Sequence, residues 1–137
     1  MAEQWLEVVK EYPPNIDKID AALHVKKQTG IVYAYGGKIY APDSNNDLPF
    51  DIHEHERVHA RQHEAHGGSE AWWDRYLNDV QFRLEQEVEA YRAQLAYIDA
   101  HYGRQSRRHA RDYICSTLAS AMYGNLVSKK EAATLLS

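Results

Sequence analysis

The sequence is poor in cysteine and has no long apolar run. A single cysteine among 137 residues excludes an internal disulfide and is typical of a reducing compartment. No stretch approaches the roughly 18 apolar residues of a membrane helix. The first ten residues lack the basic start and apolar stretch of a signal peptide. We therefore expect a cytoplasmic protein with no membrane partner, in which Cys115 is a small buried residue.

An excess of positive charge is also missing. The formal net charge of −4 argues against a general nucleic-acid binder, so we expect no nucleic-acid partner. Arg104, Arg107, Arg108 and Arg111 form the local exception, which we interpret as a solvated helix start. Length and a hydrophobic content of 44% predict one folded domain over residues 1–137, with a core at about 16–102 and a C-terminal helical extension at about 104–137.

Histidine, by contrast, is concentrated in residues 53–63, which contain one intact His-Glu-x-x-His motif. Its members are His55, Glu56 and His59. At about 100° per residue on a helix, His55 and His59 share a face and can bind one metal ion. Glu56 lies beside them, where a carboxylate can take the proton of a metal-bound water. The motif therefore predicts a metal site with hydrolytic chemistry.

The other histidines of this segment are interpreted as surroundings. A motif starting at His53 would need a histidine at position 57, which is Arg57. His63 and His66 lie near the motif face or at the end of the helix, where a supporting or surface role is the more frequent one. The alternative for the whole segment is a polar helix that happens to be rich in histidine.

Two histidines leave a catalytic zinc ion one protein ligand short. The metzincin pattern would supply it with Gly at 62 and His at 65, but the chain has Gln62 and Ala65, and no inverted HxxEH motif occurs. The remaining option is a carboxylate from a following helix.

Three glutamates on the next long helix, predicted over about Val80–Tyr102, are the candidates. With Leu84 as the centre of its apolar stripe, Glu87 lies about 60° off centre, Glu85 about 100° and Glu89 about 140°. Only Glu87 points to the buried face, where a carboxylate is costly unless it is paired or bound to a metal. We predict Glu87 as the third ligand, with an ion pair to a buried arginine as the alternative, and Glu85 and Glu89 as solvated charges.

Hydrophobic periodicity and turn residues predict the other elements. Two β-rich runs flank Gly36-Gly37 and read as a tight hairpin. The predicted elements are helices over 2–11, 16–25, 47–66, 69–77, 80–102, 106–123 and from 128, with strands over 31–35 and 38–41.

The His-Glu-x-x-His motif, followed on the next long helix by Glu87-Val88-Glu89-Ala90, resembles the gluzincin zinc metallopeptidases. The second element looks like the Glu-x-Glu-Ala of the membrane-embedded prenyl-protein peptidases and the ImmA-type metallopeptidases, in which the first Glu is the ligand. The stretch from about Tyr33 to Gln94 also resembles small uncharacterised bacteriophage proteins. One departure is Tyr91, at a position where many gluzincins have an Asp that supports the first histidine.

This resemblance implies an α+β fold of the minimal gluzincin type. It is mainly helical, with a small β-hairpin or sheet packed on the His-Glu-x-x-His helix, then the Glu-bearing helix and C-terminal helices. A phage origin would place the protein in the host cytoplasm or the virion.

The function predicted on these grounds is that of a zinc-dependent metallopeptidase with one Zn²⁺ per chain. His55, His59 and Glu87 are the predicted ligands, and Glu56 takes the proton of the attacking water and passes it to the leaving amine. Tyr91 is the candidate oxyanion donor. The substrate is a peptide or protein, which we expect to add as a strand at an exposed hairpin edge near Ile39 to Ala41.

Three alternatives remain open at this point. Two histidines and one carboxylate also form the facial triad of non-haem Fe(II) oxygenases, although those sites usually lie on a β-barrel and this sequence has too few strands. A non-catalytic, metal-stabilised phage structural or interaction protein could retain the same fold. Nucleic-acid binding through the arginines at 104–111 would predict a salt-dependent affinity.

Overall fold

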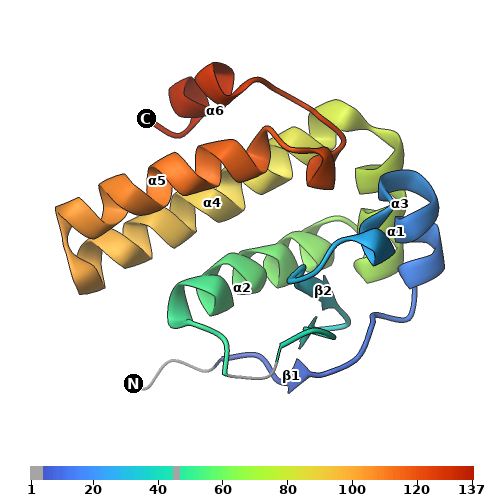
Figure 1. Cartoon of the computed structure of the whole chain (residues 1–137). Helices are drawn as coiled ribbons and strands as arrows, with labels where there is room; N and C mark the ends of the chain where they lie inside the picture. Colours follow the sequence, from blue (N-terminus) through green and yellow to red (C-terminus); the bar gives the residue numbers. More distant parts are fainter. Residues whose placement is uncertain (1–4, 45–46) are drawn as a thin grey trace.

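The computed structural model describes residues 5–44 and 47–137. Over these residues the chain forms six α-helices and one three-stranded sheet, which makes it a mainly helical α+β protein, as predicted (Figure 1). None of the helices in the described part of the chain is long and apolar enough to cross a membrane.

The helices pack around the pair formed by α2 and α4. Helix α2 packs on α4, and α5 runs back along α4 (Figure 1). The bounds are α1 (Ile16–Leu23), α2 (Phe50–Ala65), α3 (Ser69–Asn78), α4 (Val80–Tyr102), α5 (Arg104–Leu118) and α6 (Lys129–Leu135), with short 3-10 helices η1 (Val25–Lys27) and η2 (Ala121–Tyr123).

The sheet consists of β1 (Val8–Val9), β2 (Tyr33–Tyr35) and β3 (Lys38–Tyr40), in the order β1-β3-β2. Strands β2 and β3 form the predicted hairpin, antiparallel and with Tyr33 opposite Tyr40. Its two-residue turn needs positive φ at both positions, and Gly36 and Gly37 adopt φ of 59° and 76°. The hairpin is therefore confirmed, and it packs β2 against α2.

The N-terminal segment is a strand, so the helix expected over residues 2–11 is wrong for its described part; residues 2–4 lie outside the described residues. The Ile39 N–H donates to the Glu7 carbonyl and the Ala41 N–H to the Val9 carbonyl, each at 2.8 Å. A ten-residue helix is marginal alone, whereas β-branched valines pair readily with an open strand.

This pairing also corrects the predicted docking edge near Ile39 to Ala41. Strand β3 is the central strand, and β1 takes up the backbone groups that a bound peptide would need. A substrate strand cannot add there.

Helix α5 begins and ends earlier than the predicted span of 106–123. Gly103, with φ of 95°, ends α4 and lets the next helix start directly at Arg104. The helix stops at Leu118, and the Ser120 hydroxyl accepts the Met122 N–H to begin η2 as a separate turn. The break places Met122 and Tyr123 beside the candidate site described below.

One continuous core joins the helices and the sheet. It includes Trp72, Leu95 and Leu118, and also Cys115, whose predicted burial is confirmed. The N-terminal cap of α4 is Asp79, whose side chain accepts the Phe82 N–H.

A buried arginine connects three elements behind the site. Arg83 donates to the carbonyls of Tyr76 at 2.9 Å, Leu77 at 3.1 Å and Tyr123 at 2.9 Å. Tyr76 and Leu77 lie in the last turn of α3, where the helix dipole favours a cation. Arg83 thus holds α3, α4 and η2 together. These bonds go to backbone carbonyls, and the described residues show no ion pair between Arg83 and Glu87.

Candidate metal centre

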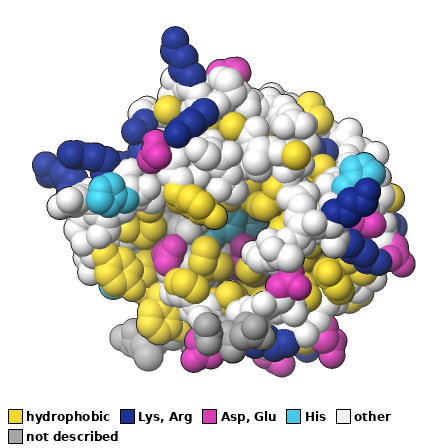
Figure 2. All heavy atoms as spheres, viewed as in Figure 1, with side chains coloured by type: hydrophobic (Ala, Val, Ile, Leu, Met, Phe, Trp, Pro, Cys, Tyr) yellow, Lys and Arg dark blue, Asp and Glu magenta, His cyan; other side chains and the backbone are white. Residues whose placement is uncertain are grey.

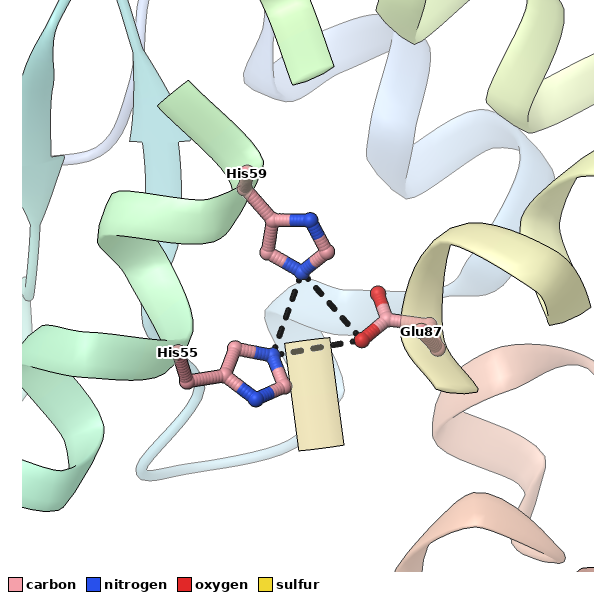
Figure 3. Close-up of side chains that lie close together, drawn as sticks. All are labelled: His55, His59 and Glu87. Atoms are coloured by element: carbon pink, nitrogen blue, oxygen red, sulfur yellow. Dashed lines mark hydrogen bonds and ion pairs between the residues drawn. The ribbon is translucent and has the colours of Figure 1, made fainter. Parts of the chain in front are cut away.

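Two facing helices bring the three predicted ligands together. His55 and His59 project from successive turns of α2, and Glu87 projects toward them from α4 (Figure 3). The two Nε2 atoms are 3.1 Å apart, and each lies 3.2 Å from the Glu87 Oε1 atom. All three side chains are buried. The structure therefore confirms that these residues can form one metal-binding group.

The spacing of the donor atoms fits a tetrahedral ion. Ligands at ~2.0–2.1 Å from a tetrahedral zinc lie about 3.3–3.4 Å from one another. The observed triangle of 3.1, 3.2 and 3.2 Å is close to this size. Two imidazoles and one carboxylate also match the ligand set of catalytic zinc sites. The residues present fit a zinc ion.

A glutamine fixes the orientation of the first histidine. The Gln94 Oε1 atom lies 3.0 Å from the His55 Nδ1 atom, while the Gln94 Nε2 atom donates to the Asp51 carboxylate at 2.8 Å. Because the amide nitrogen faces Asp51, its oxygen faces the ring, so the His55 Nδ1 atom carries the hydrogen. The unprotonated Nε2 atom then faces Glu87. Support of this kind raises a ligand's basicity and fixes its tautomer.

A second glutamine does the same for the other histidine. The Gln62 Oε1 atom lies 2.7 Å from the His59 Nδ1 atom. The Gln62 amide nitrogen donates to the Gln86 carbonyl at 3.0 Å and to the Glu89 carboxylate at 2.6 Å. His59 therefore also presents an unprotonated Nε2 atom to the site.

Three hydrogen-bond acceptors thus converge on one buried point, an arrangement that requires a cation. Burial lowers the pKa of His59, but attraction to Glu87, with smaller contributions from Glu56 and Gln62, raises it to about 9. Burial also raises the pKa of Glu87, but His59 and His55 hold that pKa well below its usual range. Without a metal, a proton on the His59 Nε2 atom takes the place of the cation.

Tyr76 completes the support of the carboxylate. Its hydroxyl donates to the Glu87 Oε2 atom at 2.6 Å, which leaves the Oε1 atom to face the histidines. Burial, the Glu87 charge and this hydrogen bond raise the pKa of Tyr76 well above its usual value, so the phenol keeps its proton.

Glu56 lies beside the ligands but outside the donor triangle. Its Oε2 atom is 3.8 Å from the His55 Nε2 atom, and 5% of the residue is exposed. Burial raises the pKa of Glu56, an effect that His55 and His59 oppose. A carboxylate of raised pKa next to a metal site has the properties of a general base.

Tyr91 lies against the site as a ring and not as a free hydroxyl. Its ring meets the His55 ring edge-on, with the centroids 4.4 Å apart. Its hydroxyl is hydrogen-bonded to the hydroxyl of Tyr123, from η2, at 2.5 Å. The C-terminal part of the chain therefore reaches the candidate metal centre through this tyrosine pair.

The remaining histidines stay outside the donor group. His53 packs with Trp5 and Phe50 near the start of α2. The His63 Nδ1 atom pairs with the Ser69 hydroxyl at 2.8 Å, and burial followed by the nearby His59 lowers the pKa of His63 to about 3.

Trp72 lies between two of the α2 histidines. Its ring centroid is 4.3 Å from that of His63 and 5.2 Å from that of His59. His66 is exposed. Glu85 and Glu89 are exposed as predicted, although Glu89 also receives the Gln62 bond.

Sequence reasoning missed the residues that orient the ligands. Gln94 follows Glu87 by two helical turns, and Tyr76 lies on a helix for which the pattern indicates only packing. Asp51 precedes His55 by one turn of α2 and looks like an ordinary first-turn acid. A face analysis of α4 that marked every polar residue on the Glu87 side would have selected Gln94, although not its partner.

A cleft of about 330 Å³ opens the site to solvent. Helices α2, α4 and α5, the segment 28–32 and η2 line it. Figure 2 shows a hollow in this face, with a histidine at its floor and hydrophobic side chains around it. His55 and Glu56 both line the cleft, so a molecule entering it meets a metal ligand and the buried carboxylate together.

Comparison with protein-family models, with curated proteins and with solved structures finds no match to this chain. The geometry and chemistry of the site are therefore what bear on its function.

Proposed function

We propose that this protein is a zinc-dependent metallopeptidase. The observation that carries the proposal is the meeting of His55, His59 and Glu87 at 3.1–3.2 Å, with Glu56 beside them in a solvent-connected cleft. A hydrolase of this kind needs three protein ligands, an open position and a general base, and these residues offer that set.

His55, His59 and Glu87 would hold the ion, and Gln94, Gln62 and Tyr76 keep their donor atoms aimed at it. A bound Zn²⁺ supplies a Lewis acid that polarises a substrate carbonyl and lowers the pKa of water. Glu56 accepts the proton of the attacking water and passes it to the leaving amine. Its burial favours this role, because a carboxylate of raised pKa holds a proton long enough to transfer it.

The oxyanion donor is assigned to the tyrosine pair. Tyr91 and Tyr123 line the same cleft as Glu56, and burial keeps the pKa of both phenols well above its usual value. One hydrogen of the pair lies between the two oxygens, and we assign the other to the developing negative charge. Tyr76 is not part of this assignment because its hydroxyl is bound to Glu87.

The test is the Glu56→Gln variant in a peptide-library cleavage assay. The wild type should contain one zinc per chain and hydrolyse peptides. Glu56→Gln should keep its zinc and lose at least about 100-fold of the activity, because it lacks the base. Glu64, on the exposed side of the same helix, provides the matched control Glu64→Gln, which should remain active.

Two outcomes would contradict the proposal. Absence of stoichiometric zinc in the purified protein removes its basis, and anaerobic preparation with metal analysis distinguishes zinc from iron. Zinc without hydrolysis would instead favour the alternative, a non-catalytic, metal-stabilised structural or interaction protein.

A further inference from the structure

The cleft beside the candidate metal centre is lined, within the described part of the chain, by acidic residues without basic ones. Asp51 lines it one turn before His55, and Glu56, the residue after His55, lines it as well. No lysine or arginine of the described residues lines it. In Figure 2 the lysine and arginine side chains lie toward the outer parts of this face, away from the hollow. The ionised groups at the cleft are thus carboxylates.

Asp51 has an unused capacity to bind a cation. Its Oδ2 atom accepts from Gln94 at 2.8 Å, and no lysine or arginine of the described chain forms an ion pair with it. Asp51 is half-buried. A carboxylate accepts several hydrogen bonds, so a substrate cation could reach the oxygen that Gln94 leaves free.

The rest of the cleft wall is largely apolar, although polar residues such as Gln28, Thr29, Gln94 and Thr117 also line it. Ile31, Val32 and Ile52 form one part of it, and Ile114 and Met122, from the C-terminal segments, form another. Such walls bury apolar side chains well and oppose the entry of a carboxylate that has no partner. A substrate's free C-terminal carboxylate would meet no cation of the chain there.

We propose that Asp51 is a specificity-determining residue that selects peptides with a cationic group next to apolar residues, and that the cleft rejects acidic ones. The cation is a lysine or arginine side chain or the free α-ammonium group of the peptide. As a statement about hydrolysis this inference rests on the proposed peptidase function, but as a statement about binding it does not.

The experiment measures peptide binding to the zinc-loaded Glu56→Gln protein by calorimetry. The probes are apolar heptapeptides, acetylated and amidated, with Lys, Leu or Glu at one position at a time. The Lys peptides should bind up to about fivefold more tightly than the Leu peptides, as for a partly exposed ion pair, and the Glu peptides more weakly than both. The preference should decrease with added salt. Unacetylated Leu peptides, compared with acetylated ones, identify the α-ammonium group as the cation.

Adding Asp51→Asn removes the charge but retains an oxygen for Gln94 to bind, and measurements of zinc content and thermal stability check that the metal centre is intact. The preference for Lys should then disappear, whereas the exposed control Glu64→Gln should preserve it. Equal binding of Lys and Glu peptides, a preference that survives Asp51→Asn, or no peptide binding at all would overturn the inference.

Hydrolysis of the same peptides by the wild type separates the two proposals. Cleavage without charge preference contradicts the role of Asp51 and leaves the peptidase standing. Charge-selective binding without cleavage contradicts the peptidase and leaves the role of Asp51 standing.

Discussion

At the scale of single residues, the candidate metal centre consists of three donor atoms whose lone pairs point toward a common position. Each donor atom is turned inward by a neighbour that binds the opposite side of the same group: Gln94 behind His55, Gln62 behind His59 and Tyr76 behind Glu87. The free-energy cost of orienting the ligands is therefore met when the chain folds, before any metal binds. This makes the metal-free state sensitive to protons.

The metal-free protein should lose stability as the pH rises above neutrality. The pKa of His59 is about 9 in the fold, against about 6.5 in an unfolded chain, so protonation of His59 favours the fold. This contribution, roughly a few kcal/mol, is fully present below about pH 6.5 and is lost as the pH rises through about 9. Thermal unfolding in the presence of a chelator, from pH 6 to pH 9.5, should show a falling Tm. A His59→Gln variant should lose this dependence, and the exposed His109→Gln control should retain it. A flat wild-type profile would contradict the assignment.

Gln94→Leu should weaken zinc binding by about 10–100-fold, the usual effect of removing the partner of a liganding histidine. The leucine fills the space but leaves the His55 Nδ1 hydrogen without an acceptor. Competition with a chromophoric chelator measures the affinity. The exposed Gln81→Leu on the same helix is the control, and an unchanged affinity for Gln94→Leu would show that the glutamine is dispensable.

The predictability of these residues differs for a physical reason. Helical spacing identifies His55, Glu56 and His59, and the cost of burying a carboxylate singles out Glu87 from its neighbours. A neutral amide carries no comparable penalty, so Gln94 gives no signal alone. The role of Gln94 becomes apparent only from its contact with His55, which lies 39 residues away along the chain.

At the scale of elements, the best-predicted parts are those whose signals are local. The Gly36-Gly37 turn and α4, between Asp79 and Gly103, follow from their own residues. Strand β1 could not be predicted from its own residues, because its partner β3 lies about thirty residues further on and nothing in residues 5–9 indicates that pairing. The same applies to the break between α5 and η2, which depends on what Tyr123 contacts.

Arg83→Met should destabilise the fold by about 3 kcal/mol, because the carbonyls of Tyr76, Leu77 and Tyr123 would lose a charged donor and remain buried. Chemical denaturation measures the loss. Arg108→Met, on the exposed part of α5, removes the same charge and should have little effect. Equal stability of the two variants would show that the arginine is not the connection between α3, α4 and η2.

At the scale of the whole molecule, the candidate centre joins α2 and α4, which are separated in the sequence by α3. A metal bound by α2 and α4 closes the contact between the first and second halves of the chain. The fold class and the central helices could be predicted from the sequence. The closing of the cleft by α5 and η2 could not, because nothing in the residues of those segments indicates that they pack beside His55 and Glu56.

Zinc should raise the Tm of the protein by several degrees, since an ion that binds only the folded state at 100 times its Kd adds about 2.7 kcal/mol. Excess chelator should reverse the shift. His59→Ala should abolish it, and His109→Ala, at an exposed position, should not. A zinc-induced shift of equal size in His59→Ala would mean that the ion binds elsewhere.

The position of Trp72 has an optical consequence. Its indole is 1% exposed and lies against the ring of His59. A protonated imidazole quenches indole emission more strongly than a neutral one, so we expect the emission of Trp72 to depend on whether His59 carries a proton or faces a metal ion. We therefore expect tryptophan emission, to which Trp5 and Trp73 also contribute, to change when the centre binds or releases a metal ion, so that metal binding could be followed without an added dye.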